Sequence, residues 1–193
     1  MIPQPSNEEV EKYLERWNSL ENYVLQERSL DRLFKDKFPN NTEIEDILIK
    51  VSTLNDFYST NIYSVFPVAK HILNMNIDER LLEGDPTLVS EIAVVDISGK
   101  TKNFYSFASK YCSHHNQEKF PIYDSYVEKV LQYFRRQDGF SKFRSEDLKN
   151  YPVFKEVLVQ FADYYGIRGY GLKDLDRYLW QLGKEFFPKK YKR

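Results

Sequence analysis

Apolar residues recur at helical spacing along almost the whole of this sequence. The first stripe consists of Val10, Tyr13, Leu14, Trp17, Leu20 and Val24. Residues three and four apart share one face of an α-helix, and further stripes of this kind follow, separated by Pro, Gly and Asn. The nearest approach to a strand is Val94-Val95, which is too short to predict one. The pattern therefore predicts an all-α fold of roughly nine to ten helices.

Capping residues place the ends of several helices. Ser6 is a favourable N-cap, and Glu8 and Glu9 follow it in the first turn, where the helix dipole favours negative charge. Asp124 stands in the same position before the apolar residues of 126–134, and Gly139 is placed to end that helix. These signals predict a first helix after residue 6 and another after residue 124.

The length and composition are those of a folded globular chain. Its 193 residues fit a single helical domain, residues 1–193, with a lobed layout. A hydrophobic content of 41% with 30% charged residues excludes disorder. Aromatic residues reach 16% and include 15 tyrosines, which suit half-hydrated positions such as cleft walls as well as the core.

Several features bound the location of the protein. No run of about 18 apolar residues is present, so we expect no transmembrane helix. Residues 1–9 lack the basic and apolar regions of a signal peptide. Cys112 is the only cysteine, so a disulfide within the chain is impossible, which fits a reducing compartment. We therefore expect a cytoplasmic protein.

The charge balance limits how the chain could bind nucleic acid. The net charge of −1 argues against a protein covered with DNA-binding charge, but 28 Lys and Arg residues can still form a local basic face. The C-terminal residues 188–193 are one basic cluster, for which a solvated tail is favoured over a phosphate contact.

A short polar segment interrupts the helical pattern at residues 96–102. It contains Ser98, Gly99, Lys100 and Thr101, with Lys102 directly after them, and apolar helical stripes flank it on both sides. A hairpin of this kind presents backbone N–H groups at a helix N-terminus, and these groups together with lysines suit a phosphate. Any connection between two helices needs a glycine or polar turn, so the segment alone favours a purely structural interpretation.

The second segment of interest runs from Phe120 to Leu131. It brings Asp124 to the start of a helix, directly after the sequence Phe-Pro-Ile-Tyr. An aspartate in this position is most simply an N-cap, which contributes about 1 kcal/mol to helix stability. Capping by itself explains Asp124 without any catalysis.

Together the two segments resemble the helix-hairpin-helix DNA glycosylase superfamily, most closely its 8-oxoguanine DNA glycosylase branch. The shared order, over about residues 86–137, is a helix, a lysine-bearing hairpin, an apolar helix, and an aspartate before a helix that begins Ser-Tyr-Val. The resemblance implies a two-lobed helical bundle with a cleft between the lobes. It also implies that the hairpin grips the DNA backbone.

The resemblance assigns roles by position. It makes Asp124 the catalytic aspartate and Lys102 the nucleophile that forms a Schiff base with the sugar, with Lys100 as second choice, and it implies that Asp124 and Lys102 face each other across the cleft. The DNA contacts that it implies are those of Ser98, Gly99, Lys100, Thr101, Ser125 and Tyr126.

Physical chemistry sets conditions on these roles. An attacking lysine must be neutral, which requires a pKa lowered by desolvation or by a neighbouring cation, and Lys100 could supply that cation for Lys102. The carboxylate of Asp124 would stabilise the positive charge that develops on the sugar. An extruded base needs a pocket with aromatic walls, which the many tyrosines and phenylalanines could provide, although such rings are more often core.

The sequence departs from the family pattern at two places. The usual hairpin has two glycines, whereas only Gly99 is present, and Tyr126 replaces the usual histidine. These changes affect DNA gripping and substrate choice. No four-cysteine cluster follows, so an iron–sulfur cluster is excluded and no cofactor is expected.

The run Cys112-Ser113-His114-His115 is the remaining candidate for chemistry. A metal site is not expected here, because His71 is the only other histidine and no second cysteine exists. A Cys–His nucleophilic pair is also disfavoured, since residues two and three apart on a helix align poorly.

The leading functional expectation is DNA repair or surveillance. The chain would recognise a damaged or extruded base in DNA, with N-glycosidic cleavage and lyase activity through Lys102. The alternatives are a non-enzymatic module that keeps the fold and binds nucleic acid or protein, for example in phage defence, and a plain helical interaction protein in which Asp124 is only a cap.

Overall fold

The computed structural model describes residues 2–188. Within them lie ten α-helices, two short helical segments of other types and one two-stranded sheet, which confirms the expected all-α class. The described chain divides into two compact units, of which unit 1 comprises residues 2–21 and 123–188 and unit 2 comprises residues 22–122. The basic C-terminal cluster lies outside the described residues from residue 189 onward.

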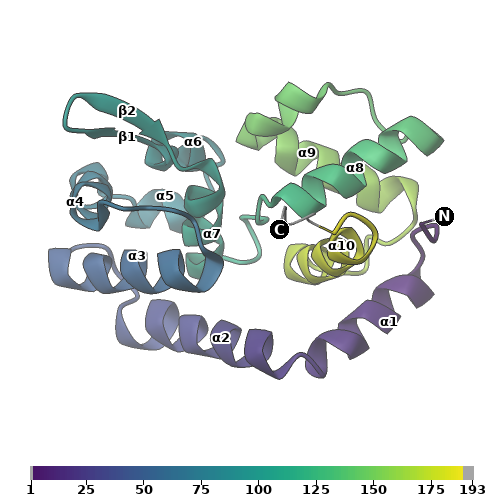
Figure 1. Cartoon of the computed structure of the whole chain (residues 1–193), viewed down its shortest axis with the longest axis horizontal. Helices are drawn as coiled ribbons and strands as arrows, with labels where there is room; N and C mark the ends of the chain where they lie inside the picture. The colour runs from purple at the N-terminus through teal and green to yellow at the C-terminus, as the bar shows by residue number, and fades with distance from the viewer. Residues whose placement is uncertain (1, 189–193) are drawn as a thin grey trace, which may run out of the picture. The chain divides into compact units, whose positions relative to one another are not determined.

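Unit 1 is a group of helices drawn from both ends of the chain (Figure 1). Its elements are α1 (Asn7–Asn18), α8 (Ser125–Asp138), the 3₁₀ helix η2 (Ser145–Lys149), α9 (Tyr151–Tyr164) and α10 (Leu172–Phe186). Helix α10 packs against both α1 and α8. The predicted cap of α1 is confirmed, because the Ser6 hydroxyl accepts the backbone N–H of Glu9 at 3.2 Å.

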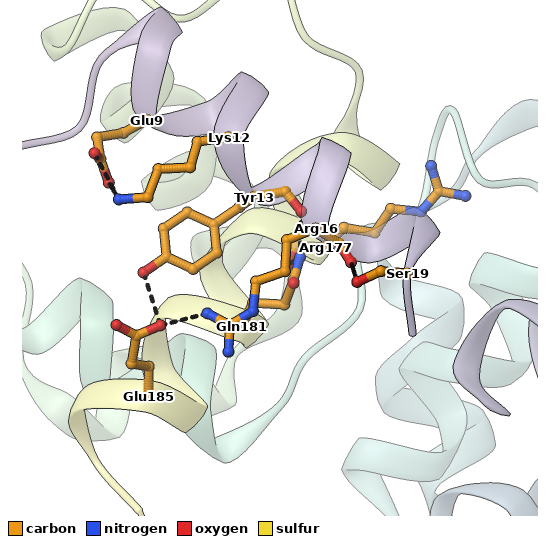
Figure 2. Close-up of polar contacts among 8 residues, drawn as sticks. All are labelled: Glu9, Lys12, Tyr13, Arg16, Ser19, Arg177, Gln181 and Glu185. Carbon is orange, nitrogen blue, oxygen red and sulfur yellow. Dashed lines mark hydrogen bonds and ion pairs between the residues drawn. The ribbon is translucent and has the colours of Figure 1, made fainter. Parts of the chain in front are cut away.

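A polar cluster joins α1 to α10 within unit 1, as Figure 2 shows. The Tyr13 hydroxyl donates to Glu185 Oε2 at 3.2 Å, and Arg16 donates to the same oxygen at 2.5 Å. Gln181 Nε2 donates to the Tyr13 carbonyl at 2.8 Å. Burial and the nearby Glu185 carboxylate raise the pKa of the Tyr13 hydroxyl, so it stays protonated and able to donate.

Aromatic side chains fill much of the core of unit 1. Phe134 of α8 lies 5.8 Å from Phe161 of α9 between ring centroids, and Phe161 lies 4.8 Å from Tyr165. Phe140, in the connection after α8, meets Phe161 edge to face at 5.2 Å. Such tilted and edge-on pairs are the favourable arrangement for aromatic rings. Much of the high aromatic content therefore belongs to the core.

Unit 2 holds the remaining helices and the sheet. Its elements are α2 (Glu21–Asp31), the π-helical segment η1 (Arg32–Lys37), α3 (Ile44–Tyr58), α4 (Val65–Met75), α5 (Asp78–Glu83), α6 (Thr87–Ala93), β1 (Val94–Ile97), β2 (Lys100–Asn103) and α7 (Tyr105–His115). Helix α3 packs against α4 and α7, and α6 packs against α7. The central helix α7 is buried over residues 107–114.

The segment between α6 and α7 differs from the prediction. It was expected to be a polar turn between two helices, but it is an antiparallel β-hairpin in which Val94 pairs with Asn103 and Ile97 with Lys100 (Figure 1). The sequence signal is weak because all four residues of β2 are exposed and none is apolar, so the usual alternation is missing.

Among residues 2–188, none of the helices combines the length and the hydrophobicity that a membrane-spanning helix requires.

Candidate functional site

The β1–β2 hairpin closes with a two-residue turn, Ser98-Gly99. Both residues have positive φ, 54° and 75°, which is the conformation that tight hairpin turns require and that glycine adopts without strain. The backbone N–H of Gly99 donates to Asp96 Oδ1 at 3.0 Å. Ser98, Gly99, Lys100 and Thr101 are all exposed.

The expected helix N-terminus at this hairpin was wrong. Helix α7 begins at Tyr105, beyond the end of β2, and the N–H of Phe104 is taken by the Ala93 carbonyl at 2.8 Å. Residues 98–101 form the tip of a β-ladder because Val94–Ile97 and Lys100–Asn103 satisfy each other's backbone groups. The hairpin therefore offers lysine side chains, rather than a row of helical N–H groups, to an anion.

Two lysines share one face of β2. Lys100 and Lys102 are two residues apart on the strand, so their side chains project to the same side, and both are exposed. The desolvation that a nucleophilic lysine needs is not provided to Lys102 by the described residues of unit 2. What this pair can do in its present surroundings is bind an anion such as phosphate.

Asp124 lies at the end of a buried extended segment that contains Phe120, Ile122 and Tyr123. Its backbone is extended, with φ −140° and ψ 150°, and its Oδ1 accepts the N–H of Tyr126 at 2.9 Å. The predicted N-cap of α8 is thus confirmed. Asp124 is half-buried, so its carboxylate is held in a defined place at the start of the helix.

The two residues that follow differ in their surroundings. Ser125 is exposed, whereas Tyr126 is half-buried against α10. A Cβ built on Gly183 would lie 2.7 Å from Tyr126 Cβ, so only glycine permits this approach of the helices. The Lys129 ammonium lies 5.6 Å from the centre of the Tyr126 ring. Tyr126 therefore has a packing role between α8 and α10.

A second polar group lies one turn further along α8, and the sequence analysis did not anticipate it. The Tyr123 hydroxyl donates to Glu128, and Lys149 of η2 donates to both the Tyr123 hydroxyl and Glu128 Oε2, the latter at 2.9 Å. The Lys149 ammonium also lies 4.3 Å from the centre of the Tyr123 ring. Glu128 is four residues from Asp124, which is the spacing that could have indicated a shared face.

The predicted site residues belong to different units. Lys102 and the other hairpin residues lie in unit 2, whereas Asp124, Ser125 and Tyr126 lie in unit 1. The expectation that Asp124 and Lys102 face each other across a cleft stays a prediction.

Unit 2 contains a buried polar network centred on Lys50 of α3, which the sequence analysis missed. The Lys50 ammonium has no exposed surface and donates to the Phe38 carbonyl at 3.0 Å, the Asn40 carbonyl at 2.8 Å and Asn41 Oδ1 at 2.8 Å. Burial lowers the pKa of Lys50 to about 8. The network therefore ties α3 to residues 38–41 through one buried cation.

Asn41 is the second centre of this network. Its backbone N–H and its Nδ2 donate to the Asp78 carboxylate at 2.9 and 2.6 Å, and its Oδ1 accepts from Lys50 and from the Tyr111 hydroxyl, the latter at 2.5 Å. Burial raises the pKa of the Tyr111 hydroxyl, which keeps it a donor. Every polar group of the Asn41 side chain is engaged, as a buried amide requires.

His115, the last residue of α7, borders the same network. Its Nε2 lies 3.3 Å from Asn41 Nδ2 and 3.4 Å from Lys50 Nζ. Burial, together with the Lys50 charge, lowers the pKa of His115 well below its usual range. The imidazole is therefore neutral, and Nε2 is the acceptor of the two ring nitrogens.

A cavity of about 430 Å³ opens beside this network. Its lining residues are Pro39, Asn40, Asp78, Glu79, Leu81, Leu82, His115 and Asn116. The volume falls within the range of small-molecule sites.

The sequence did contain a signal for the buried lysine. Lys50 is three residues after Ile47 and four before Leu54, both of which are buried, so it stands on the apolar stripe of α3. Asn41, Asp78 and His115 were harder to find, because residues so far apart in the sequence are brought together only by the tertiary fold.

The run from Cys112 to His115 lies on the buried helix α7, and no group of three or more His, Cys, Asp or Glu side chains among the described residues could hold a metal ion. Cys112 is fully buried, and burial raises the pKa of its thiol, so it is held in the unreactive form. His114 Nε2 lies 3.0 Å from the Tyr58 hydroxyl.

Comparison with known proteins places the chain in a family. The model of the family HI_0787_N, described as an N-terminal domain, matches residues 9–119. The chain belongs to this family. An uncharacterized protein of Haemophilus influenzae is similar to it, with 55% identity over 151 residues, which cover 78% of this chain and 72% of that protein. No solved structure matches.

The HI_0787_N match covers the sites of unit 2 described above. It spans the hairpin, the Lys50 network and the cavity-lining residues of unit 2, and it ends before Asp124.

Proposed function

We propose that this protein is a cytoplasmic DNA glycosylase-like protein that recognises a damaged or extruded base. The observation that best supports the proposal is the order of elements from α6 to α8. The chain passes from α6 through a lysine-bearing hairpin, helix α7 and a buried extended segment to Asp124 at the start of α8. This is the order that the resemblance to helix-hairpin-helix DNA glycosylases requires.

The hairpin would contact the DNA backbone. Lys100 and Lys102 project from the same face of β2, and both are exposed. Lysine–phosphate contacts position a protein on DNA without reading the base sequence. In this role Lys100 lies beside the turn Ser98-Gly99 and Lys102 two residues further along β2, both exposed, so that a DNA backbone can approach them.

Asp124 would serve the chemical step. Cleavage breaks the bond between C1′ of the sugar and the base nitrogen, and the bonding electrons leave with the base, which takes up a proton. The Asp124 carboxylate would stabilise the positive charge that develops on the sugar. Attack by the Lys102 amine on C1′ would give the Schiff base and lyase activity, whereas attack by water would give simple hydrolysis.

A second candidate function is a nucleic-acid-binding module without catalysis. One observation favours it: Lys102 and all other residues of β2 are exposed, so the described residues of unit 2 do not desolvate its amine. An exposed lysine can bind phosphate, whereas a lysine that attacks a sugar has to be desolvated or placed beside another cation.

Borohydride trapping on oligonucleotides separates the two candidates. The parent protein would be incubated with duplex and single-stranded DNA carrying 8-oxoguanine or an abasic site, beside Lys102→Gln, Lys100→Gln and Asp124→Asn. Lys37→Gln is the matched control, because Lys37 is another exposed lysine of unit 2 and lies outside the hairpin.

Three outcomes are informative. A trapped adduct that is lost in Lys102→Gln and kept in Lys37→Gln supports the glycosylase with Lys102 as its nucleophile. Base release without an adduct, lost in Asp124→Asn, supports hydrolysis by water. Salt-sensitive DNA binding with neither adduct nor base release contradicts the glycosylase and supports the binding module.

A further inference from the structure

The cavity beside His115 has an acidic lining. Asp78 and Glu79 contribute two carboxylates, and neither lysine nor arginine is among the eight lining residues. Glu79 is exposed and makes no hydrogen bond or ion pair with the described residues, whereas the Asp78 carboxylate accepts hydrogen bonds from the backbone N–H and the Nδ2 of Asn41. The cavity is therefore suited to a cation and unsuited to a phosphate.

His115 adds one neutral donor to this lining. Because its Nε2 faces donors on Asn41 and Lys50, the proton of the neutral ring is on Nδ1. No described residue accepts a hydrogen bond from Nδ1, although His115 borders the cavity. A ligand oxygen in the cavity would satisfy this donor.

The walls of the cavity are held in place by hydrogen bonds. Asn116 Nδ2 donates to the carbonyls of Leu81 and Leu82 at 3.0 and 3.4 Å, which ties the end of α7 to α5. On the other side the Lys50 ammonium holds the Asn40 carbonyl. A site whose walls are fixed before binding avoids the entropy cost of ordering them.

We infer that this cavity binds an alkylguanidinium or alkylammonium group that carries a neutral oxygen close by. The carboxylates of Asp78 and Glu79 accept the N–H groups of the cation, and His115 Nδ1 donates to the oxygen. Leu81, Leu82 and Pro39 contact the aliphatic stem. An arginine or lysine residue of a protein partner has this chemistry, and so does a free amine metabolite.

The inference is independent of the proposed DNA function. The cavity has the same sign of charge as a nucleic-acid backbone, and its lining residues do not include the hairpin lysines. Loss of DNA binding would leave it intact, and failure of cation binding would leave the DNA proposal intact.

Nuclear magnetic resonance titration tests the inference with four probes. Nα-acetyl-argininamide is the cationic probe, and Nα-acetyl-citrullinamide is its neutral counterpart of nearly the same shape. Agmatine represents a free amine that lacks the amide oxygens, and inorganic phosphate tests the opposite charge. The imidazole signal of His115 is the readout, because it reports binding inside the cavity.

The matched variants are Glu79→Gln and Glu83→Gln. Both residues are exposed on α5, but only Glu79 lines the cavity. We expect saturable binding of Nα-acetyl-argininamide that shifts the His115 signal, weakened about fivefold by Glu79→Gln, since a solvent-accessible ion pair contributes about 1 kcal/mol. Glu83→Gln should bind as the parent does.

The remaining outcomes indicate the source of the ligand and decide whether the inference holds. Tighter binding of the blocked arginine than of agmatine supports an arginine residue of a protein partner as ligand, whereas tighter binding of agmatine, which lacks the oxygen, overturns the predicted hydrogen bond from His115 Nδ1. Equal binding of the arginine and citrulline probes overturns the inference. So does unchanged binding in Glu79→Gln, or a His115 shift caused by phosphate alone.

Discussion

The Lys50 ammonium lies 2.8 Å from Asn41 Oδ1 in the interior of unit 2. This contact joins helix α3 to the segment that precedes it, and through Asn41 it reaches the Asp78 carboxylate on α5. Helix α3, the segment that precedes it and the distant helix α5 are thus linked by one lysine and one asparagine. Asn40, Asp78 and His115, which belong to this network, also line the cavity for which we infer an organic cation.

Replacement of Asn41 tests this network. Asn41→Ala removes the acceptor of the buried Tyr111 hydroxyl, one of the three acceptors of Lys50 and one donor to Asp78, so we expect the free energy of unfolding to fall by about 3 kcal/mol. Urea denaturation at neutral pH measures it. Asn40→Ala is the control, because the exposed Asn40 contributes its backbone carbonyl to Lys50 and should keep nearly the parent stability. Equal losses in the two variants would contradict the account.

The pH dependence of stability tests the environment of Lys50. Burial lowers its pKa from 10.5 to about 8, so between these two values the unfolded chain binds a proton that the folded chain has released. Stability contributed by this group therefore rises with pH across that window.

The measurement compares the parent with Lys50→Met by urea denaturation at several pH values. The difference isolates Lys50, because the tyrosines and other lysines titrate in both proteins. We expect the parent to gain stability relative to Lys50→Met as the pH rises from 8 to 10.5. If the difference in unfolding free energy does not change with pH, or if Nζ of Lys50 titrates near 10.5 in the folded parent, the lowered pKa of Lys50 would be contradicted.

Because α8 and α10 approach closely at Gly183, replacing this glycine should lower the stability far more than replacing Gly169. In Gly183→Ala the new Cβ would lie 2.7 Å from the Tyr126 carbonyl oxygen, so the helices must separate, and we expect a loss of about 2 kcal/mol. Gly169→Ala is the control, since nothing lies within 4 Å of its Cβ position. Thermal unfolding of both variants measures the contrast, and similar midpoints would refute the packing argument.

Two replacements of Asp124 separate its capping role from its proposed chemistry. Asn caps helices as well as Asp, so Asp124→Asn should unfold like the parent, whereas Asp124→Ala should lose about 1 kcal/mol. If the carboxylate acts in catalysis, base release should fall about 100-fold or more in both variants. Parent-like activity in Asp124→Asn would leave Asp124 with the capping role alone.

Local signals in the sequence predicted local structure well. Ser6 and Asp124 cap the helices where expected, and Gly139 ends α8 in the left-handed conformation. These features depend on a few neighbouring residues, whose backbone preferences are strong. The β-hairpin was missed because β2 lies fully in solvent and lacks an apolar face, so its pairing left no alternating pattern.

The candidate sites were less predictable, because they depend on contacts between residues that are distant in the sequence. The hairpin lysines and Asp124 could be named from a motif, but whether they meet depends on two separate units. The Lys50 network was not predicted, since a lysine in an amphipathic helix is usually at the surface. Within this network Asn41 donates to Asp78, which lies 37 residues further along the chain, so only the tertiary fold creates this contact.

The central claim is that the hairpin lysines hold DNA, and the salt dependence of DNA affinity tests it most directly. Fluorescence anisotropy would follow the binding of a labelled duplex to the parent, to Lys37→Gln and to the double variant Lys100→Gln/Lys102→Gln over a series of salt concentrations. We expect salt-sensitive binding by the parent and by Lys37→Gln. In the double variant we expect a salt slope smaller by about two, one for each lost phosphate contact. Absence of DNA binding by the parent, or an unchanged slope in the double variant, would contradict the account.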